Sequence, residues 1–144
     1  MRCEAEVAAE TCTGATVLRG AGVKHSRFLA ELRRSKVCFS PFGYGEVCWR
    51  DYEAVLSGAV VLKPDMSHVE TDPDIFVAWK TYAPVAWDLS DLRDVLDRLL
   101  SDTVLRETLA SNAFKAVQRW LNSDAFAHRV RSIFVQPDSS FSLS

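Results

Sequence analysis

The chain has 144 residues, of which 48% are hydrophobic and 25% are charged, and this balance is typical of a soluble globular protein with one core. Its 17 Lys and Arg residues against 19 Asp and Glu residues give a formal net charge of -2. Nucleic-acid binding usually leaves a strongly basic sequence, so we expect no nucleic-acid partner.

The amino-terminal residues 1–14 are acidic and contain no long apolar run. A signal peptide needs an apolar stretch of about 7–15 residues and a membrane-spanning helix about 20. We therefore expect no transmembrane segment and a cytoplasmic location, unless the chain is a fragment of a longer protein. Residues 1–14 are predicted to be a poorly patterned lead-in to a single domain over residues 1–137, and the serine-rich residues 138–144 a disordered tail.

The next segment carries the first periodic pattern. Residues 15–18 are predicted to be a brief strand or an extended lead-in. From about Val23, apolar residues recur at the spacing of a helix that ends near Ser35, namely Phe28, Leu29 and Leu32. The cations that follow fit either the solvated end of this helix or a phosphate-binding patch: Arg33, Arg34 and Lys36.

Residues 36–62 have the pattern of a βαβ unit. Residues 36–42 are dense in β-favouring types and stop at a proline and a glycine, which predicts a buried strand. A helix is predicted from about Cys48 or Trp49 to Ser57, with Gly58 as its stop. Residues 59–62 then form a second strand, ended by Lys63 and Pro64. Because both strands are continuously apolar, they are predicted to be parallel and covered on both faces.

Residues 82–87 are predicted to be a third strand, and its proline indicates an edge or a bulge. An amphipathic helix follows with Ser90 as its N-cap, then a helix from about Thr103 to Leu121 and another after Ser123. The buried faces of the last two are expected to carry Leu105, Leu109, Ala113, Val117 and Trp120, then Phe126, Val130, Ile133 and Phe134. The predicted fold is a small Rossmann-like α/β domain with a parallel sheet of about three to four strands flanked by helices.

The cysteines and histidines have no zinc-ligand spacing, because no CxxC pair occurs among Cys3, Cys12, Cys38 and Cys48. We interpret the cysteines as free thiols, with Cys38 and Cys48 buried as small hydrophobic residues, although the sequence leaves disulfides open. We expect no metal and no cofactor.

The segment SPFGYGEVCWRDYEA lies where a parallel α/β unit binds ligands, at the carboxyl end of a strand and the start of a helix. Gly43 and Gly45 could adopt positive φ, and Arg50 adds a planar cation on the first helical turn. Glu53 lies one turn further on, where it could accept sugar hydroxyls. The alternative is a simple turn, with Arg50 and Glu53 as an exposed ion pair.

The longer segment SPFGYGEVCWRDYEAVLSGAVVLKPD resembles the donor-binding segment of GT-B-type glycosyltransferases, and most of all their exostosin-like branch. The likeness extends from about Ser35 through the SDLRDVLDRLL and LASNAFKAV segments. It implies that Glu53 bonds the ribose of a nucleotide sugar and that Arg50 contacts the diphosphate. Many of these enzymes have another Glu eight positions earlier, where this chain has Gly45, with Glu46 one place later.

Carried over by position, the resemblance implies Arg50 as the catalytic residue and a donor site made of Gly43, Tyr44, Gly45, Glu46, Arg50, Glu53, Lys63 and His68. Lys63 and His68 are included in this site because the loop that carries them follows the second predicted strand, at the same edge of the sheet. Asp72 and Asp74 match the DxD metal motif of the other glycosyltransferase fold, but a solvated turn is the expected role. Core packing is expected for the tryptophans, and stacking on a base is the alternative.

The resemblance implies a metal-independent hexosyltransferase-type protein that binds a nucleotide-diphosphate sugar, with the chain as the C-terminal half of a GT-B-like fold. In that fold the acceptor site and the usual catalytic base belong to an N-terminal domain, so transfer is expected to need such a domain or subunit. The alternative is a noncatalytic α/β interaction or regulatory module of similar origin. The sequence leaves open the donor base and sugar, the acceptor, and whether the linkage is inverted or retained.

Overall fold

The computed structural model describes residues 16–18 and 22–134, so the predicted lead-in over 1–14 and the predicted tail over 138–144 lie outside the described residues. The elements in chain order are α2 (His25–Leu32), β1 (Val37–Phe39), α3 (Trp49–Ser57), β2 (Val60–Pro64), β3 (Ala83–Val85), α4 (Leu92–Ser101), α5 (Thr103–Leu121) and α6 (Ala125–Phe134).

The strands form one three-stranded sheet in the order β1-β2-β3, and both neighbouring pairs are parallel. Val37 pairs with Val60 in the first register, and Leu62 pairs with Ala83 in the second. The predicted parallel α/β sheet is therefore confirmed, and the chain has a Rossmann-like arrangement of strands and flanking helices.

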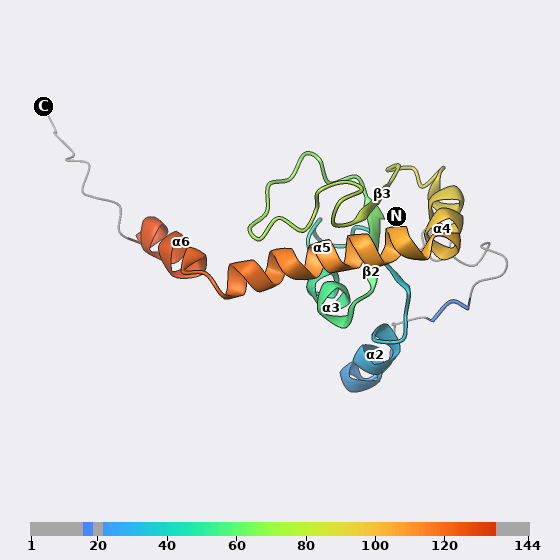
Figure 1. Ribbon diagram of the computed structural model, residues 1–144, viewed down its shortest axis with the longest axis horizontal. Coiled ribbons are helices and arrows are strands. Elements are labelled where there is room, and N and C mark those ends of the chain that lie inside the picture. The colour runs from blue at the N-terminus through green and yellow to red at the C-terminus, as the bar shows by residue number, and fades with distance from the viewer. Residues whose placement is uncertain (1–15, 19–21, 135–144) are drawn as a thin grey trace, which may run out of the picture.

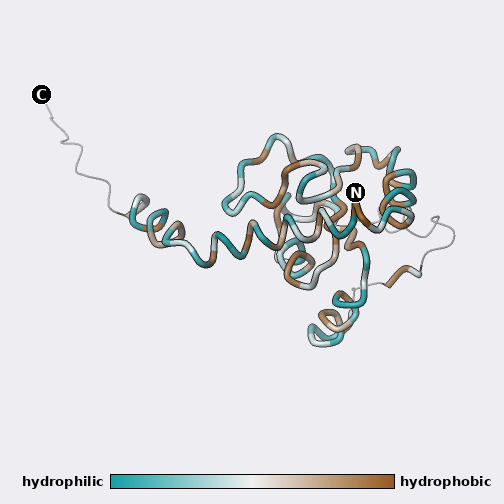
Figure 2. Tube along the Cα trace, viewed as in Figure 1, coloured by the Kyte–Doolittle hydropathy of each residue, from teal (hydrophilic) through white to brown (hydrophobic). Residues whose placement is uncertain are grey.

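Side chains alternate between the two faces of the sheet and build two hydrophobic clusters. Cys38 and Val61 pack with α2, α3 and the second half of α5. Val60, Leu62 and Val85 pack on the opposite face with α4 and the first half of α5. All five residues of β2 are buried, and those of β1 and β3 are buried or half-buried, as expected of a parallel sheet covered on both faces. Figure 2 shows hydrophobic segments in the central part of the molecule, where the strands lie, and along α4.

Helix α5 belongs to both clusters because it runs past the amino ends of the strands (Figure 1). Arg106 and Ala110 line a hollow with Lys36 and Val60, which stand at the start of β1 and β2. A long helix at the amino end leaves loops to cover the carboxyl ends of the strands. That is the end at which parallel sheets bind ligands.

Two features end the helices around the sheet. Gly58 caps α3 with φ 81°, a left-handed conformation that glycine adopts without strain, as predicted. At the end of α4, the buried Arg106 guanidinium donates hydrogen bonds to the carbonyl oxygens of Leu99 and Leu100 at 2.6 and 2.8 Å. This arginine satisfies carbonyls that a helix end leaves without partners. Sequence periodicity alone did not indicate its burial.

The structure corrects several predicted boundaries. Helix α2 ends at Leu32 rather than near Ser35, and α4 begins at Leu92 with Asp91, not Ser90, as its N-cap. The Asp91 carboxylate accepts a hydrogen bond from the Ala86 N–H instead of capping the helix. The α3 and α5 boundaries are confirmed at Trp49–Ser57 and Thr103–Leu121. Thr16–Leu18 are exposed and form no strand.

The predicted apolar faces of the last helices are only partly buried. Leu109, Ala113 and Val117 are buried, whereas Leu105 and Trp120 are half-buried. In α6, Phe126 and Phe134 are exposed because this helix projects beyond the sheet and contacts mainly the end of α5 (Figure 1). No helix in the described part of the chain is long and apolar enough to cross a membrane.

Candidate functional site

The loops that follow the three strands meet at one edge of the sheet. They cover residues 40–48 after β1, 65–69 after β2 and 86–91 after β3, and we call them together the carboxyl edge. The sequence predicted a ligand site at this edge because the strands were expected to be parallel. The predicted donor residues that come together here are Tyr44, Glu46 and His68, along with the glycines of the first loop.

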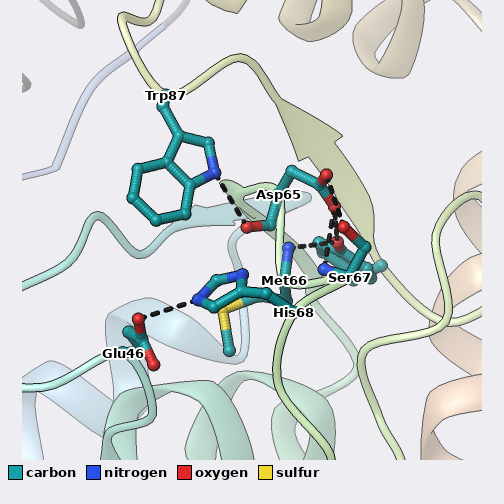
Figure 3. Close-up of polar contacts among 7 residues, drawn as sticks. Glu46, Asp65, Met66, Ser67, His68 and Trp87 are labelled. Carbon is teal, nitrogen blue, oxygen red and sulfur yellow. Dashed lines mark hydrogen bonds and ion pairs between the residues drawn. The ribbon is translucent and has the colours of Figure 1, made fainter.

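His68 joins the first loop to the second and packs beside the third (Figure 3). Its Nε2 lies 2.8 Å from Glu46 Oε1, and both side chains are about half exposed. The Trp87 ring centroid lies 5.1 Å from that of His68 and 5.3 Å from that of Phe42. A carboxylate, an imidazole and an indole from three loops therefore form one half-open surface.

Asp65 holds the second and third loops in place. Its carbonyl oxygen accepts a hydrogen bond from Trp87 Nε1 at 3.1 Å, and its carboxylate accepts two from Ser67 and one from the Tyr82 hydroxyl at 3.3 Å. The Ser67 hydroxyl and N–H lower the pKa of the Asp65 carboxyl below its ordinary value, because both donors favour the charged form. Asp65 thus remains ionised at neutral pH.

A buried ion pair lies beneath this surface. Lys63 and Asp51 are both 0% exposed, and the Lys63 ammonium lies 3.2 Å from Asp51 Oδ2 and 3.3 Å from Oδ1. The ammonium also donates to the Ser40 carbonyl at 3.2 Å and faces the rings of Phe42 and Phe76, at 5.3 and 5.9 Å from their centroids. Charge, hydrogen bonds and aromatic faces together compensate the lysine for its loss of water.

Lys63 was predicted to lie in a loop and approach a phosphate, and the structure corrects that location. It belongs to strand β2 on the same face as Val61, turned towards α3. Asp51, on the first turn of α3, also accepts a hydrogen bond from the Cys48 N–H at 2.9 Å. Lys63 therefore has a buried, structural position in which its ammonium connects the end of β1 to the start of α3.

The glycine loop differs in one respect from the prediction. Among the described glycines, only Gly22 and Gly58 have positive φ, so Gly43 and Gly45 do not use the freedom that was expected. A Cβ at Gly43 would meet no atom within 4 Å, and one at Gly45 would lie 3.8 Å from the Val47 carbonyl. The backbone of this loop lies open, and the Tyr44 side chain beside it is fully exposed.

Arg50 is half-buried on the first turn of α3. It forms no hydrogen bond or ion pair with the residues that the structure describes, so the alternative Arg50–Glu53 pair is not formed. Burial raises the pKa of the Cys38 thiol to about 12, and the positive charge of Arg50 opposes that rise. Cys38 and Cys48 are free thiols, the first buried and the second half-buried; Cys3 and Cys12 lie outside the described residues.

Glu53 has its partner outside the carboxyl edge. Its Oε1 lies 2.6 Å from His25 Nε2, which joins α3 to α2 rather than to the loops of the carboxyl edge. The glutamate is three-quarters buried while the histidine is largely exposed. The sequence correctly predicted that Glu53 lies on this helix. That its partner is His25 became visible only from the packing of α2 against α3.

The remaining predictions concern metals and aromatic residues. The part of the chain that the structure describes contains no group of three ligands for a metal, and Asp74 accepts a hydrogen bond from the Phe76 N–H. The expectation that tryptophans pack in the core is wrong for Trp49, Trp79 and Trp87, whose exposed fractions are 85%, 38% and 50%. The Arg98 guanidinium covers the Trp79 ring at 4.5 Å.

Sequence reasoning did not assign roles to Asp51, Asp65 and Phe42. A signal for Asp51 existed, because an acidic residue at the third position of a helix can bond the N-cap backbone. A lysine that continues an apolar strand also indicates a buried partner, since an unpaired buried charge is costly.

Comparison with known proteins finds no family model, no curated protein and no solved structure that matches the chain. The class that fold and site define is an α/β domain with a polar, aromatic surface at the carboxyl ends of parallel strands.

Proposed function

We propose that the chain is the donor-binding half of a GT-B-type glycosyltransferase of the exostosin-like branch, and that its carboxyl edge binds a nucleotide-diphosphate sugar. The observation that carries this proposal is the meeting of three loops beside the start of α3, with Arg50 free of any partner among the described residues. Parallel α/β domains bind phosphorylated ligands in this position.

In this proposal Arg50 binds the diphosphate. Its guanidinium offers two parallel donors, and the first N–H groups of α3 have no partner within the helix. During transfer the diphosphate leaves with growing negative charge, and a fixed arginine beside helix amides neutralises that charge without a metal. The Asp51 carboxylate repels the diphosphate only weakly, because the buried Lys63 ammonium, 3.2 Å away, compensates its negative charge.

His68 and Glu46 are proposed to contact the sugar. Both are half exposed, and each can exchange its partner for a sugar hydroxyl at little cost, because exposed ion pairs contribute less than about 1 kcal/mol. Trp87, Tyr44 and the open backbone at Gly43 and Gly45 border the same surface. Transfer itself needs an acceptor site and a base, which the resemblance assigns to an N-terminal domain or subunit.

A noncatalytic interaction or regulatory module is the second candidate, and two observations favour it. Glu53, the proposed ribose contact, is bonded to His25, and Lys63 is fully buried. A donor would therefore have to displace His25 before Glu53 could accept its ribose hydroxyls.

Calorimetric titration with UDP, GDP, ADP and their sugars tests the proposal, and we expect at least one saturable interaction. Arg50→Ala should weaken diphosphate binding about tenfold to hundredfold, because a hydrogen bond to a charged group contributes about 1.5–3 kcal/mol. Arg50→Lys should restore only part of this, since lysine lacks the planar fork. Affinity for the bare nucleoside should stay constant.

Arg129→Ala is the matched control, because Arg129 carries the same charge and is exposed on α6, which contacts mainly α5 rather than the carboxyl edge. It should leave affinity unchanged. Absence of binding by every nucleotide, in a sample shown to be folded, would favour the noncatalytic module. Equal losses for nucleoside and diphosphate in Arg50→Ala would refute the phosphate role of Arg50.

A further inference from the structure

A second polar hollow lies away from the carboxyl edge, between the turn before β3 and the second half of α5. It has a volume of about 340 Å³ and is lined by Lys80, Thr81, Asn112, Lys115, Gln118 and Arg119, which we call the basic hollow. Lys80 and Thr81 precede β3, whereas Trp87 of the carboxyl edge follows it. The two sites therefore belong to opposite ends of that strand.

All six lining residues have polar side chains, and the charged ones among them are all cationic. Lys80, Lys115 and Arg119 are cationic, and no acidic residue lines the hollow. By contrast, the exposed Arg27 on α2 pairs with Glu31 at 2.8 Å. Within the described residues, none of the three cations of the hollow forms an ion pair with a carboxylate. Folding thus gathers positive charge from two distant segments without compensating it.

The turn that presents Lys80 is firmly built. The buried Thr81 hydroxyl accepts a hydrogen bond from the Val77 N–H at 2.9 Å and lies 2.8 Å from the Ile75 carbonyl. Asn112 of α5 donates to the Lys80 carbonyl at 3.0 Å, which ties the turn to the helix. Trp79 adopts φ 55° with its N–H bonded to the Tyr82 carbonyl. Lys80 therefore approaches α5 from a fixed backbone.

The α5 side of the hollow is equally defined. The Arg119 Nε donates to the Lys115 carbonyl at 3.2 Å, which folds the arginine back along the helix towards Lys115. Lys115 and Arg119 are one turn apart and both are exposed. Like charges at this spacing destabilise a helix slightly, and an anion between them would remove that cost.

We infer that the basic hollow binds a small, multiply charged phosphate anion of about the size of pyrophosphate. Three cations supply charge-assisted hydrogen bonds, which are shorter and stronger than neutral ones, and the Gln118 amide adds a donor. The volume is near the lower end of the range of small-molecule pockets, about 300–1,000 Å³, so the ligand is compact. This inference does not depend on the proposed function.

The test is a titration of the full chain with sodium pyrophosphate, in which nuclear magnetic resonance measures the chemical shifts of the backbone amides at each step. We expect saturable shifts at Lys80, Asn112 and Lys115. Replacing both helix cations, in Lys115→Gln/Arg119→Gln, should weaken binding at least about tenfold, since two charge-assisted contacts are lost. Lys80→Gln alone should weaken it less and serves as a second variant on the other segment.

Two controls separate this site from other causes. Arg129→Gln/Arg131→Gln removes the same charge from exposed positions of α6 outside the hollow and should leave affinity within about twofold, because screened charges at a distance contribute little. Arg50→Gln removes the proposed diphosphate contact at the carboxyl edge and should leave the shifts at Lys80 and Asn112 intact. Retention of these shifts while nucleotides fail to bind would support the basic hollow and count only against the proposed function.

Three outcomes would overturn the inference. Equal losses in the Arg129/Arg131 and Lys115/Arg119 variants would indicate general charge attraction. Loss of the shifts in Arg50→Gln would assign pyrophosphate to the carboxyl edge. A lipid phosphate has the same chemistry, so vesicles of phosphatidylcholine with phosphatidic acid form a second arm. Vesicle binding that requires Lys115 and Arg119, with no binding of free pyrophosphate, would replace the small anion by a membrane surface.

Discussion

Two ion pairs at the same edge of the sheet have opposite surroundings. Lys63 and Asp51 are 0% exposed beneath the loops, whereas the side chains of His68 and Glu46 are 40% and 44% exposed on top of them. The buried pair connects β2 to α3 and to the end of β1, so it determines where the first loop lies. The exposed pair connects loop to loop and can be exchanged for a ligand.

The difference teaches that charge has two uses at this edge. Inside the protein, Lys63 and Asp51 each have more than one polar partner, because a buried charge without partners is strongly destabilising. Outside, water screens the pair, and its geometry contributes little to stability. Substitutions should therefore separate stability from binding along this boundary.

The largest effect is expected for Asp51→Ala, which leaves the Lys63 ammonium buried without a carboxylate. Removing one partner of a buried pair costs about 3–5 kcal/mol, and the change should appear as a lower free energy of unfolding in urea. The double variant Asp51→Ala/Lys63→Met should recover much of this loss. A cost below about 1 kcal/mol for Asp51→Ala would contradict the assigned role.

A smaller loss is expected for Tyr82→Phe. The Tyr82 oxygen accepts a hydrogen bond from the buried Met66 N–H at 2.9 Å, and an unsatisfied buried group costs about 1–3 kcal/mol. Tyr52→Phe is the control, because the Tyr52 hydroxyl has no hydrogen bond among the residues described. Unfolding in urea should distinguish the two, and equal costs would refute the contribution of the hydroxyl.

The same tyrosine predicts a response to alkaline pH. Burial raises the pKa of Tyr82 from 10.0 to about 12, so the unfolded state loses its proton first. The resulting stabilisation is present below pH 10.0 and is lost as the pH rises to about 12. Between pH 10.0 and about 12, the free energy of unfolding of the Tyr82→Phe variant should therefore fall less than that of the unaltered chain.

The smallest effect on stability is expected for Glu46→Gln. This substitution removes one charge of the exposed pair, so the free energy of unfolding should change by less than about 1 kcal/mol. Binding of a nucleotide sugar should nevertheless weaken if Glu46 contacts the donor. His68→Gln, on the other side of the same pair, is the matched variant, and a large loss of stability in either would show that the pair is structural.

Sequence periodicity by itself determined the order of elements, the parallel sheet and the bounds of α3 and α5. These depend on local signals: continuous apolar runs, the glycine at position 58 and helical spacing of leucines. The direction of the strands also predicted the end of the sheet at which a ligand would bind. Local signals also placed Arg50 and Glu53 on the same helix.

Only the tertiary structure decided the partners of the charged residues. In the sequence Lys63 comes directly after the apolar run 59–62, so it could face either water or α3. In the structure Lys63 belongs to β2, and the side on which it lies and the position of Asp51 place it inside. Glu53 bonds His25 and Glu46 bonds His68, across 28 and 22 positions of the chain. Periodicity reports which face of an element is buried, but a contact between distant segments depends on how those faces pack.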